Sequence, residues 1–174
     1  MQQFLTIERT WDGQPADPAE RAEVILTQEE DGLLIEIDAP RYGDPLPDQP
    51  PGPTDALWEH EVVEVLLLGR DQRYLEVEVG PAGHYLVLEL AGVRNPVRSK
   101  IPVEITWRPS APTAGRWSAA ARIPTELLPP GLDRVNAYAM HGSGAERRYL
   151  AYHSISGDAP DFHRLDAFPE LCWS

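Results

Sequence analysis

Short segments of the chain alternate apolar and polar residues with a period of two. In the third such segment, Leu33, Ile35 and Ile37 fall on one face, and the acidic residues Glu36 and Asp38 fall on the other. A period of two is typical of a half-buried β-strand. The same reading, together with runs rich in Val and Leu, predicts strands over 4–11, 22–28, 33–39, 62–68, 74–79, 84–90, 103–107, 117–123, 135–141 and 148–153.

The predicted strands follow one another closely, with turn residues such as Asp31-Gly32 between them. This order is typical of an antiparallel β-sandwich and not of alternating strand and helix units. We therefore predict an all-β, antiparallel β-sandwich of about ten strands, with at most one or two short helical turns, one of them at 124–128. We expect residues 1–174 to form a single domain, with a long Pro-rich loop at 40–57 and an irregular C-terminal tail at 158–174.

The segment 62–68 contains one carboxylate, Glu64, among six aliphatic residues. A buried and unpaired Glu is costly, so this side chain must be paired, protonated or placed in a cleft. Trp58 lies six residues before it, directly after the Pro-rich loop. An indole at the mouth of a cleft and a carboxylate on its floor are typical of a sugar site.

The charge of the chain narrows the class of partner. The 28 acidic residues outnumber the 15 Lys and Arg, for a formal net charge of −13. Nucleic acid and anionic membrane surfaces both require a basic face, so we expect neither as a partner. The single Cys172 excludes an internal disulfide, and the first residues lack the pattern of a secretion signal. These observations predict a cytoplasmic protein.

Each candidate has a plainer structural interpretation. Trp58 could cap the core, and Glu64 could form an ion pair with Arg122 or Arg148. Glu76 and Glu78 could lie on a solvated face of the sheet. If that face is instead concave, the two carboxylates crowd against Glu64, which would raise one pKa and could serve glycoside hydrolysis.

The histidines do not form a recognisable metal motif. His84, His141, His163 and Asp161 could contribute to a His and carboxylate site, but no two of them have the close spacing of known metal ligands. We therefore predict no metal and expect structural hydrogen bonds from these side chains.

Two sets of motifs carry a resemblance to known families. Trp58 and Glu64, followed by VLL and then by YLEV from Tyr74, resemble the family-9 carbohydrate-binding modules and the wider DOMON-like superfamily. The blocks NAYAMHG from Asn136 and PDFHRL from Pro160 resemble a family of small uncharacterised proteins over nearly the whole chain.

The first resemblance implies a jelly-roll-type sandwich with a sugar site at one end or on a concave face. It implies that Trp58 stacks on the ring, that Glu64 hydrogen-bonds hydroxyls and that Phe162 is a second aromatic. Glu76 stands where such modules can carry an Arg. The superfamily also includes calcium and haem proteins. The calcium ligands have no matching positions here, and Met140 and His141 point to opposite faces, so we predict no cofactor.

Three hypotheses for function follow. The first is a binding domain for a saccharide or polyol. The second is an enzyme on the same scaffold, using clustered carboxylates or a His-bound metal. The third is a protein-interaction module that docks through the Pro-rich loop. We favour binding over catalysis, and the candidate ligand-binding residues are Trp58, Glu64, Glu76, Arg122, Asn136, Tyr138, His141 and Phe162.

Overall fold

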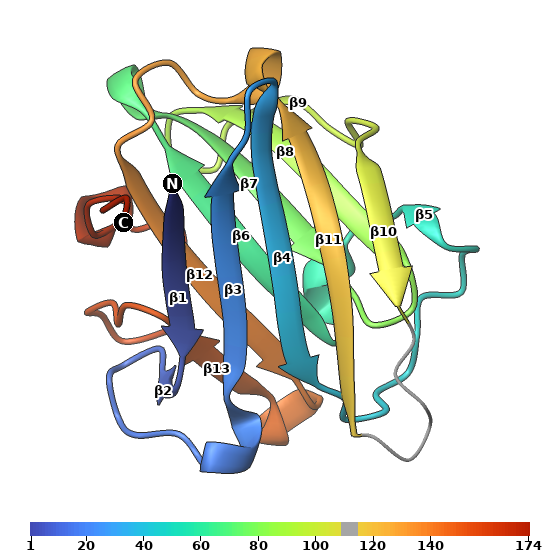
Figure 1. Ribbon diagram of the computed structural model, residues 1–174. Coiled ribbons are helices and arrows are strands. Elements are labelled where there is room, and N and C mark those ends of the chain that lie inside the picture. The colour runs from blue at the N-terminus through green and yellow to red at the C-terminus, as the bar shows by residue number, and fades with distance from the viewer. Residues whose placement is uncertain (109–114) are drawn as a thin grey trace.

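The computed structural model describes residues 1–108 and 115–174, which form an all-β sandwich of two sheets (Figure 1). The five-stranded sheet has the order β1 (Gln2–Ile7), β3 (Ala22–Gln28), β4 (Gly32–Pro40), β11 (Arg116–Pro124) and β10 (Glu104–Arg108). The eight-stranded sheet has the order β2 (Arg9–Thr10), β13 (Arg148–Ala151), β12 (Arg134–His141), β6 (Val62–Leu68), β7 (Arg73–Val79), β8 (His84–Ala91) and β5 (Gly52–Pro53), with β9 (Pro96–Arg98) also paired to β8. The pairing is antiparallel apart from β5 with β8, which confirms the predicted fold class.

All ten predicted strands are present, and the count of 13 arises from three differences. The segment predicted as one strand over 4–11 divides into β1 and β2, because the chain there crosses from one sheet to the other. The prolines of β5 and β9 concealed these two short edge strands. The predicted loop at 40–57 therefore includes a paired segment, Gly52–Pro53.

The prediction of at most one or two helical turns was wrong. The described residues contain six 3₁₀ helices of three residues each, namely η1 (Pro18–Glu20), η2 (Leu57–Glu59), η3 (Arg70–Gln72), η4 (Thr125–Leu127), η5 (Gly144–Glu146) and η6 (Leu165–Ala167). A single turn of this length has no hydrophobic periodicity of its own, so the sequence pattern could not reveal it. Only η4 lies where a helical turn was predicted, at 124–128.

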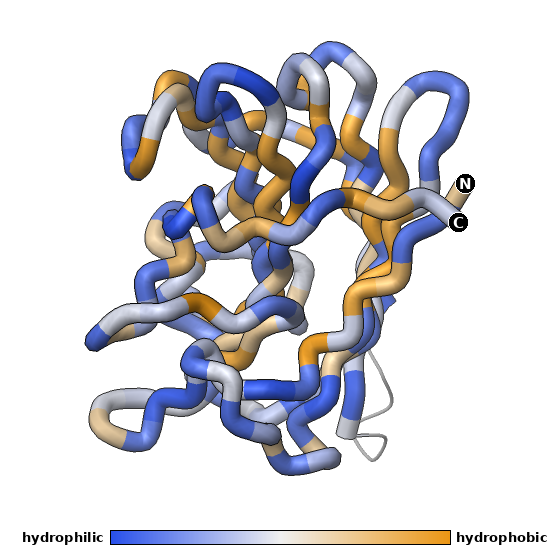
Figure 2. The backbone as a smooth tube through the Cα atoms, turned by 90° about the vertical axis from the view of Figure 1, so that its left-hand side faces the viewer, coloured by the Kyte–Doolittle hydropathy of each residue, from blue (hydrophilic) through white to orange (hydrophobic). Residues whose placement is uncertain are grey.

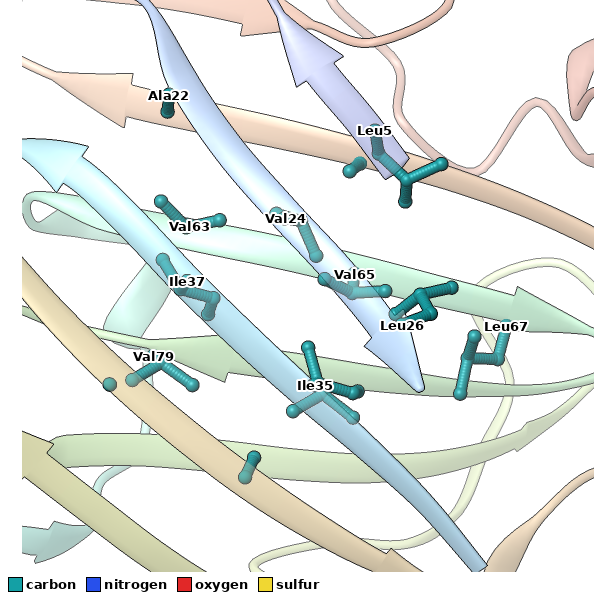
Figure 3. Packing of buried hydrophobic residues seen from close by; sticks show 14 of the residues in the cluster. Leu5, Ala22, Val24, Leu26, Ile35, Ile37, Val63, Val65, Leu67 and Val79 are labelled. Atoms are coloured by element: carbon teal, nitrogen blue, oxygen red, sulfur yellow. The ribbon is translucent and has the colours of Figure 1, made fainter. Parts of the chain in front are cut away.

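The main core lies between the two sheets. Alternate residues of β1, β3 and β4 point inward and meet alternate residues of β6 and β7 (Figure 3). Leu26, Ile35, Val65 and Leu67 are among the fully buried members. The period of two in the sequence thus describes the inner faces of both sheets.

The outer face of the eight-stranded sheet is also covered, and this second cluster positions the functional site. Leu66, Tyr74 and Tyr138 of the sheet pack against Phe162 and Phe168 of the C-terminal tail. The tail then returns to β1, where Gln2 and Ser174 exchange two backbone hydrogen bonds of 2.9 Å, so the chain ends lie side by side (Figure 2). Because β6 is covered on both faces, all seven of its residues are buried.

The start of the Pro-rich loop is held by a buried carboxylate. The Glu61 side chain accepts hydrogen bonds from the backbone N–H groups of Tyr42, Gly43 and Asp44, at 3.1–3.3 Å. Further along, His84 Nε2 donates to the carbonyl oxygen of Gln49 at 2.8 Å. These bonds fix the path by which the loop reaches η2 and Trp58.

We expect Leu67→Ala to lower the free energy of unfolding by about 2–5 kcal/mol, because it leaves a cavity between the sheets. The matched control is Leu46→Ala in the Pro-rich loop, where Leu46 is 41% exposed. This control should change stability by less than about 0.5 kcal/mol. Urea denaturation followed by circular dichroism measures both. Equal effects of the two substitutions would contradict the assignment of the core.

Candidate functional site

A pocket of about 630 Å³ lies over the outer face of the eight-stranded sheet. Small-molecule sites typically have volumes of about 300–1,000 Å³, so this one is large enough for a small molecule. Strands β6, β7 and β8 contribute Glu64, Glu76, Leu88 and Leu90 to it. The surrounding segments contribute a mostly aromatic and cationic wall, formed by Trp58, Arg94, Arg147, Tyr149, Phe162 and His163.

Three glutamates meet at the base of this pocket. Glu64 lies opposite Glu78 in the register of β6 and β7, and Glu76 lies opposite Leu66, two residues further along the same face. One carboxylate oxygen from each of the three lies within 4.8 Å of the others. The side chains of Glu64, Glu76 and Glu78 are 3%, 4% and 0% exposed. We call these residues the carboxylate triad; Glu64 and Glu76 also line the pocket.

Burial raises the pKa of each member of the triad above its ordinary value, because the interior disfavours the charged form. Coulombic repulsion from Glu76 raises the pKa of Glu64 further, and repulsion from both neighbours does the same to Glu78. The interaction between Glu76 and Glu78 acts in opposite directions on the two groups: it lowers the pKa of Glu76 and raises the pKa of Glu78. The three carboxylates therefore cannot all be ionised at neutral pH without a counter-charge.

The guanidinium groups at the pocket do not supply that counter-charge directly. Arg147 donates to the backbone carbonyl oxygens of Gly142, Trp58 and His60 at 2.6–2.9 Å. Arg94 is ion-paired with Asp161, at 2.6 Å. The charge of Arg147 lowers the pKa of Glu64, and the charge of Arg94 lowers the pKa of Glu76. Both effects are Coulombic and involve no hydrogen bond.

The aromatic residues form the upper part of the pocket. Trp58 in η2 is 45% exposed. Phe162 stacks on Tyr138, with ring centroids 3.9 Å apart, and meets the edge of Tyr149 at 6.1 Å. The Arg147 guanidinium lies 5.7 Å from the centre of the Tyr149 ring. An exposed indole and a fixed phenyl ring thus border the same space.

Four of the predicted site residues come together at this pocket: Trp58, Glu64, Glu76 and Phe162. Asn136 and Tyr138 lie beneath it and are fully buried. The Asn136 amide nitrogen donates to the Tyr138 hydroxyl at 2.7 Å and to the His153 carbonyl at 3.0 Å. The hydrogen bond from Asn136 holds the Tyr138 ring in place, and Phe162 stacks on that ring. Whether the residues at the pocket bind a ligand stays a prediction.

Arg122 and His141 do not lie at this pocket, and their predicted convergence with Glu64 was wrong. Arg122 is on β11 in the opposite sheet, where it is ion-paired with Glu29. His141 ends β12 with the opposite orientation to Met140, stacks on Tyr42 at 3.5 Å and lies 3.0 Å from Glu20. Glu64 points to the outer face of its sheet, away from the sheet that carries Arg122, and the sequence does not specify this orientation.

Arg148 does not pair with Glu64 either. Its guanidinium binds both carboxylate oxygens of Glu20 at 2.8 Å. This bidentate pair is the main reason that the pKa of Glu20 is lowered to about 2. The plainer interpretations of Glu64, an ion pair with Arg122 or with Arg148, are therefore both excluded.

Arg94 and Arg147 were not among the predicted site residues, whereas His163 was expected to form structural hydrogen bonds, and it does so here. His163 Nδ1 lies 2.7 Å from the Tyr74 hydroxyl, which in turn accepts the backbone N–H of Arg94 at 3.1 Å. A neutral His163 ring with its proton on Nε2 accepts the Tyr74 hydroxyl proton at Nδ1. Desolvation and the Arg94 charge lower the pKa of His163 to about 4. His163 lies in the PDFHRL block noted in the sequence, whereas no local motif marks Arg94 or Arg147.

We expect His163 to titrate near pH 4 in the folded protein. An unfolded His has a pKa of about 6.5, so between these values the unfolded chain binds a proton that the folded chain does not. The contribution of His163 to stability is present above pH ~6.5 and is lost as the pH falls toward 4. NMR titration checks the midpoint, with the signal assigned by its loss in His163→Gln. A midpoint at or above 6.5 would contradict a neutral, desolvated ring.

Among the described residues, none of the helices is long and apolar enough to cross a membrane.

Comparison with known proteins places the chain in a family. No family model matches it. It is 38% identical to the UPF0462 protein C4orf33 homolog of Danio rerio, over 95% of this chain and 86% of that protein. It is 40% identical to the Mus musculus homolog, over 93% and 87%, and 37% identical to the Homo sapiens protein, over 93% and 84%.

A solved structure shares the fold. The crystal structure of a candidate carbohydrate-binding protein from Bacteroides uniformis matches with a TM-score of 0.74, covering 97% of this chain and 85% of that one. The identity is 16%, so this likeness supports the fold alone. The resemblance to family-9 modules and DOMON-like proteins stays a prediction. By its similarity to the vertebrate proteins, the chain belongs to the UPF0462 family.

Proposed function

We propose that this protein binds a saccharide or a related polyol in the pocket over the eight-stranded sheet. The observation that carries the proposal is the half-exposed indole of Trp58 beside a cavity whose base holds Glu64 and Glu76. A sugar ring presents an apolar face that suits an indole and a rim of hydroxyls that suit carboxylates. The two kinds of surface lie here on one cavity.

The protonation of the triad suits a neutral polyol. A carboxylate only accepts hydrogen bonds, whereas a protonated carboxyl group can also donate one. Because burial, together with mutual repulsion, raises the pKa of these groups and favours their neutral form, members of the triad can act as donor and acceptor toward hydroxyl groups, each of which is itself both. Arg147 and His163 add polar atoms at the sides of the pocket. The acidic surface of the protein also favours neutral over anionic ligands.

Two observations favour binding over the other functions considered. A docking module without a small-molecule site would have Trp58 buried and Glu64 paired with an Arg, whereas Trp58 is exposed and Glu64 contacts neither Arg122 nor Arg148. A glycosidase places its two carboxyl groups on either side of the scissile bond, commonly more than 5 Å apart. The triad instead lies on one face of two adjacent strands, β6 and β7.

The neighbour in Bacteroides uniformis is described as a candidate carbohydrate-binding protein. This description supports the proposal only through the shared fold, because the two sequences are 16% identical. The choice of ligand depends on the local residues given above.

We expect a panel of monosaccharides and short oligosaccharides to include a ligand with a Kd in the micromolar to millimolar range, about 4–8 kcal/mol. Trp58→Ala should weaken binding of that ligand at least about tenfold, or ~1.4 kcal/mol, because it removes the stacking surface. Isothermal titration calorimetry measures this. Phe4→Ala is the matched control, since Phe4 is an exposed aromatic residue of β1 in the other sheet. The proposal would be contradicted if no member of the panel binds, or if Phe4→Ala weakens binding as much as Trp58→Ala does.

A further inference from the structure

The carboxylate triad has an unmet requirement for positive charge that the protein itself does not satisfy. We propose that Glu64, Glu76 and Glu78 together bind one divalent cation of the size and oxygen preference of Ca²⁺. This inference stands on the triad alone and does not depend on saccharide binding.

Three oxygens of the triad have no hydrogen-bond partner in the described part of the chain. Both carboxylate oxygens of Glu78, and Oε2 of Glu76, are buried without a hydrogen-bond partner among the described residues. Glu78 is fully buried, and its oxygens point toward Glu64 and Glu76. Buried polar groups are nearly always satisfied, so oxygens such as these point to a bound ligand. The nearby Arg147 cannot fill this role, because it is bound to backbone carbonyl groups.

The triad oxygens also lie close enough together to bind one ion. Ca²⁺ binds oxygen at about 2.3–2.6 Å, so two ligands on opposite sides of the ion lie up to about 4.6–5.2 Å apart. One oxygen from each member of the triad lies within 4.8 Å of the other two, which is close enough for all three to bind a single ion. Mg²⁺ requires near-ideal octahedral geometry at about 2.0–2.1 Å and usually keeps several waters, so a site made of three carboxylates suits it less well.

The ligand chemistry narrows the choice further. The triad offers only carboxylate oxygens, with no imidazole or thiolate. Oxygen-only sites suit Ca²⁺, Mn²⁺ and Mg²⁺, whereas Zn²⁺ and Cu²⁺ prefer nitrogen and sulfur ligands. A dication would replace the protons that the triad otherwise retains, and it would compensate most of the charge of three ionised carboxylates. Glu64 and Glu76 border the pocket, so water can reach the ion and complete its coordination.

On a concave face, Glu76 and Glu78 were expected to crowd against Glu64, but no metal was assigned to them, because the three are not a local motif. Glu64 comes from β6, and Glu76 and Glu78 come from β7. The register of the two strands brings them together. The sequence-based expectation of no metal considered His spacing, which does not bear on this triad.

The test is a calorimetric titration of chelator-treated, full-length protein with Ca²⁺ and, separately, with Mn²⁺, without any sugar present. We expect saturable binding of one equivalent and a rise in the melting temperature on addition of Ca²⁺. Glu78→Gln keeps the shape of the side chain and removes one charged ligand. It should raise the Kd for Ca²⁺ at least tenfold while leaving the circular dichroism spectrum unchanged. Glu64→Gln tests the same prediction if Glu78→Gln fails to fold.

The control is Glu36→Gln, which removes an exposed carboxylate from β4 in the other sheet. It should bind Ca²⁺ as the wild type does. Absence of saturable binding of both ions, or equal affinity in Glu78→Gln, Glu64→Gln and the wild type, would overturn the proposal. So would an equal loss of affinity in Glu36→Gln, which would indicate diffuse attraction to an acidic surface. Because no sugar is present, failure here leaves the saccharide proposal to its own test.

Discussion

Burial of three carboxyl groups on adjacent strands is the constraint on which the rest of this structure depends. Taking an ionised carboxylate out of water costs several kcal/mol unless a charge or hydrogen bonds compensate it. Glu64, Glu76 and Glu78 sit among aliphatic residues of β6 and β7 without an Arg or Lys bound to them in the described part of the chain. The protein can keep them there only with protons or with a bound cation.

The coverage of the eight-stranded sheet creates this environment. Its inner face packs on the five-stranded sheet, and its outer face is covered by the C-terminal tail through Phe162 and Phe168. The covering is incomplete, and the opening is the pocket. Asn136 and Tyr138 fix the position of Phe162 from below, so one border of the opening is rigid. The tail, irregular in secondary structure, thereby decides which carboxylates meet the pocket.

The strands and the anomaly of Glu64 could be predicted from the sequence, because both are local. Alternation identifies Leu33, Ile35 and Ile37 as one buried face whatever lies opposite them. The partners of a charged side chain are not local in this sense. Arg122 binds Glu29, and Arg148 binds Glu20, because sheet order places them there. The meeting of Glu64 with Glu78 likewise depends on register, which follows from the whole fold.

Strand formation alone does not require this triad. Val or Ile at the same positions would suit a buried sheet better, and apolar replacement of buried charged groups is often neutral or stabilising. A chain of ordinary stability, about 5–15 kcal/mol, cannot hold three unsatisfied carboxylates without a strong compensation. Protons or a bound cation can supply that compensation, and a cation would reach the triad through the opening beside Trp58. That argument links the two proposals, since a cation would satisfy the carboxylates and a polyol would use the indole above them.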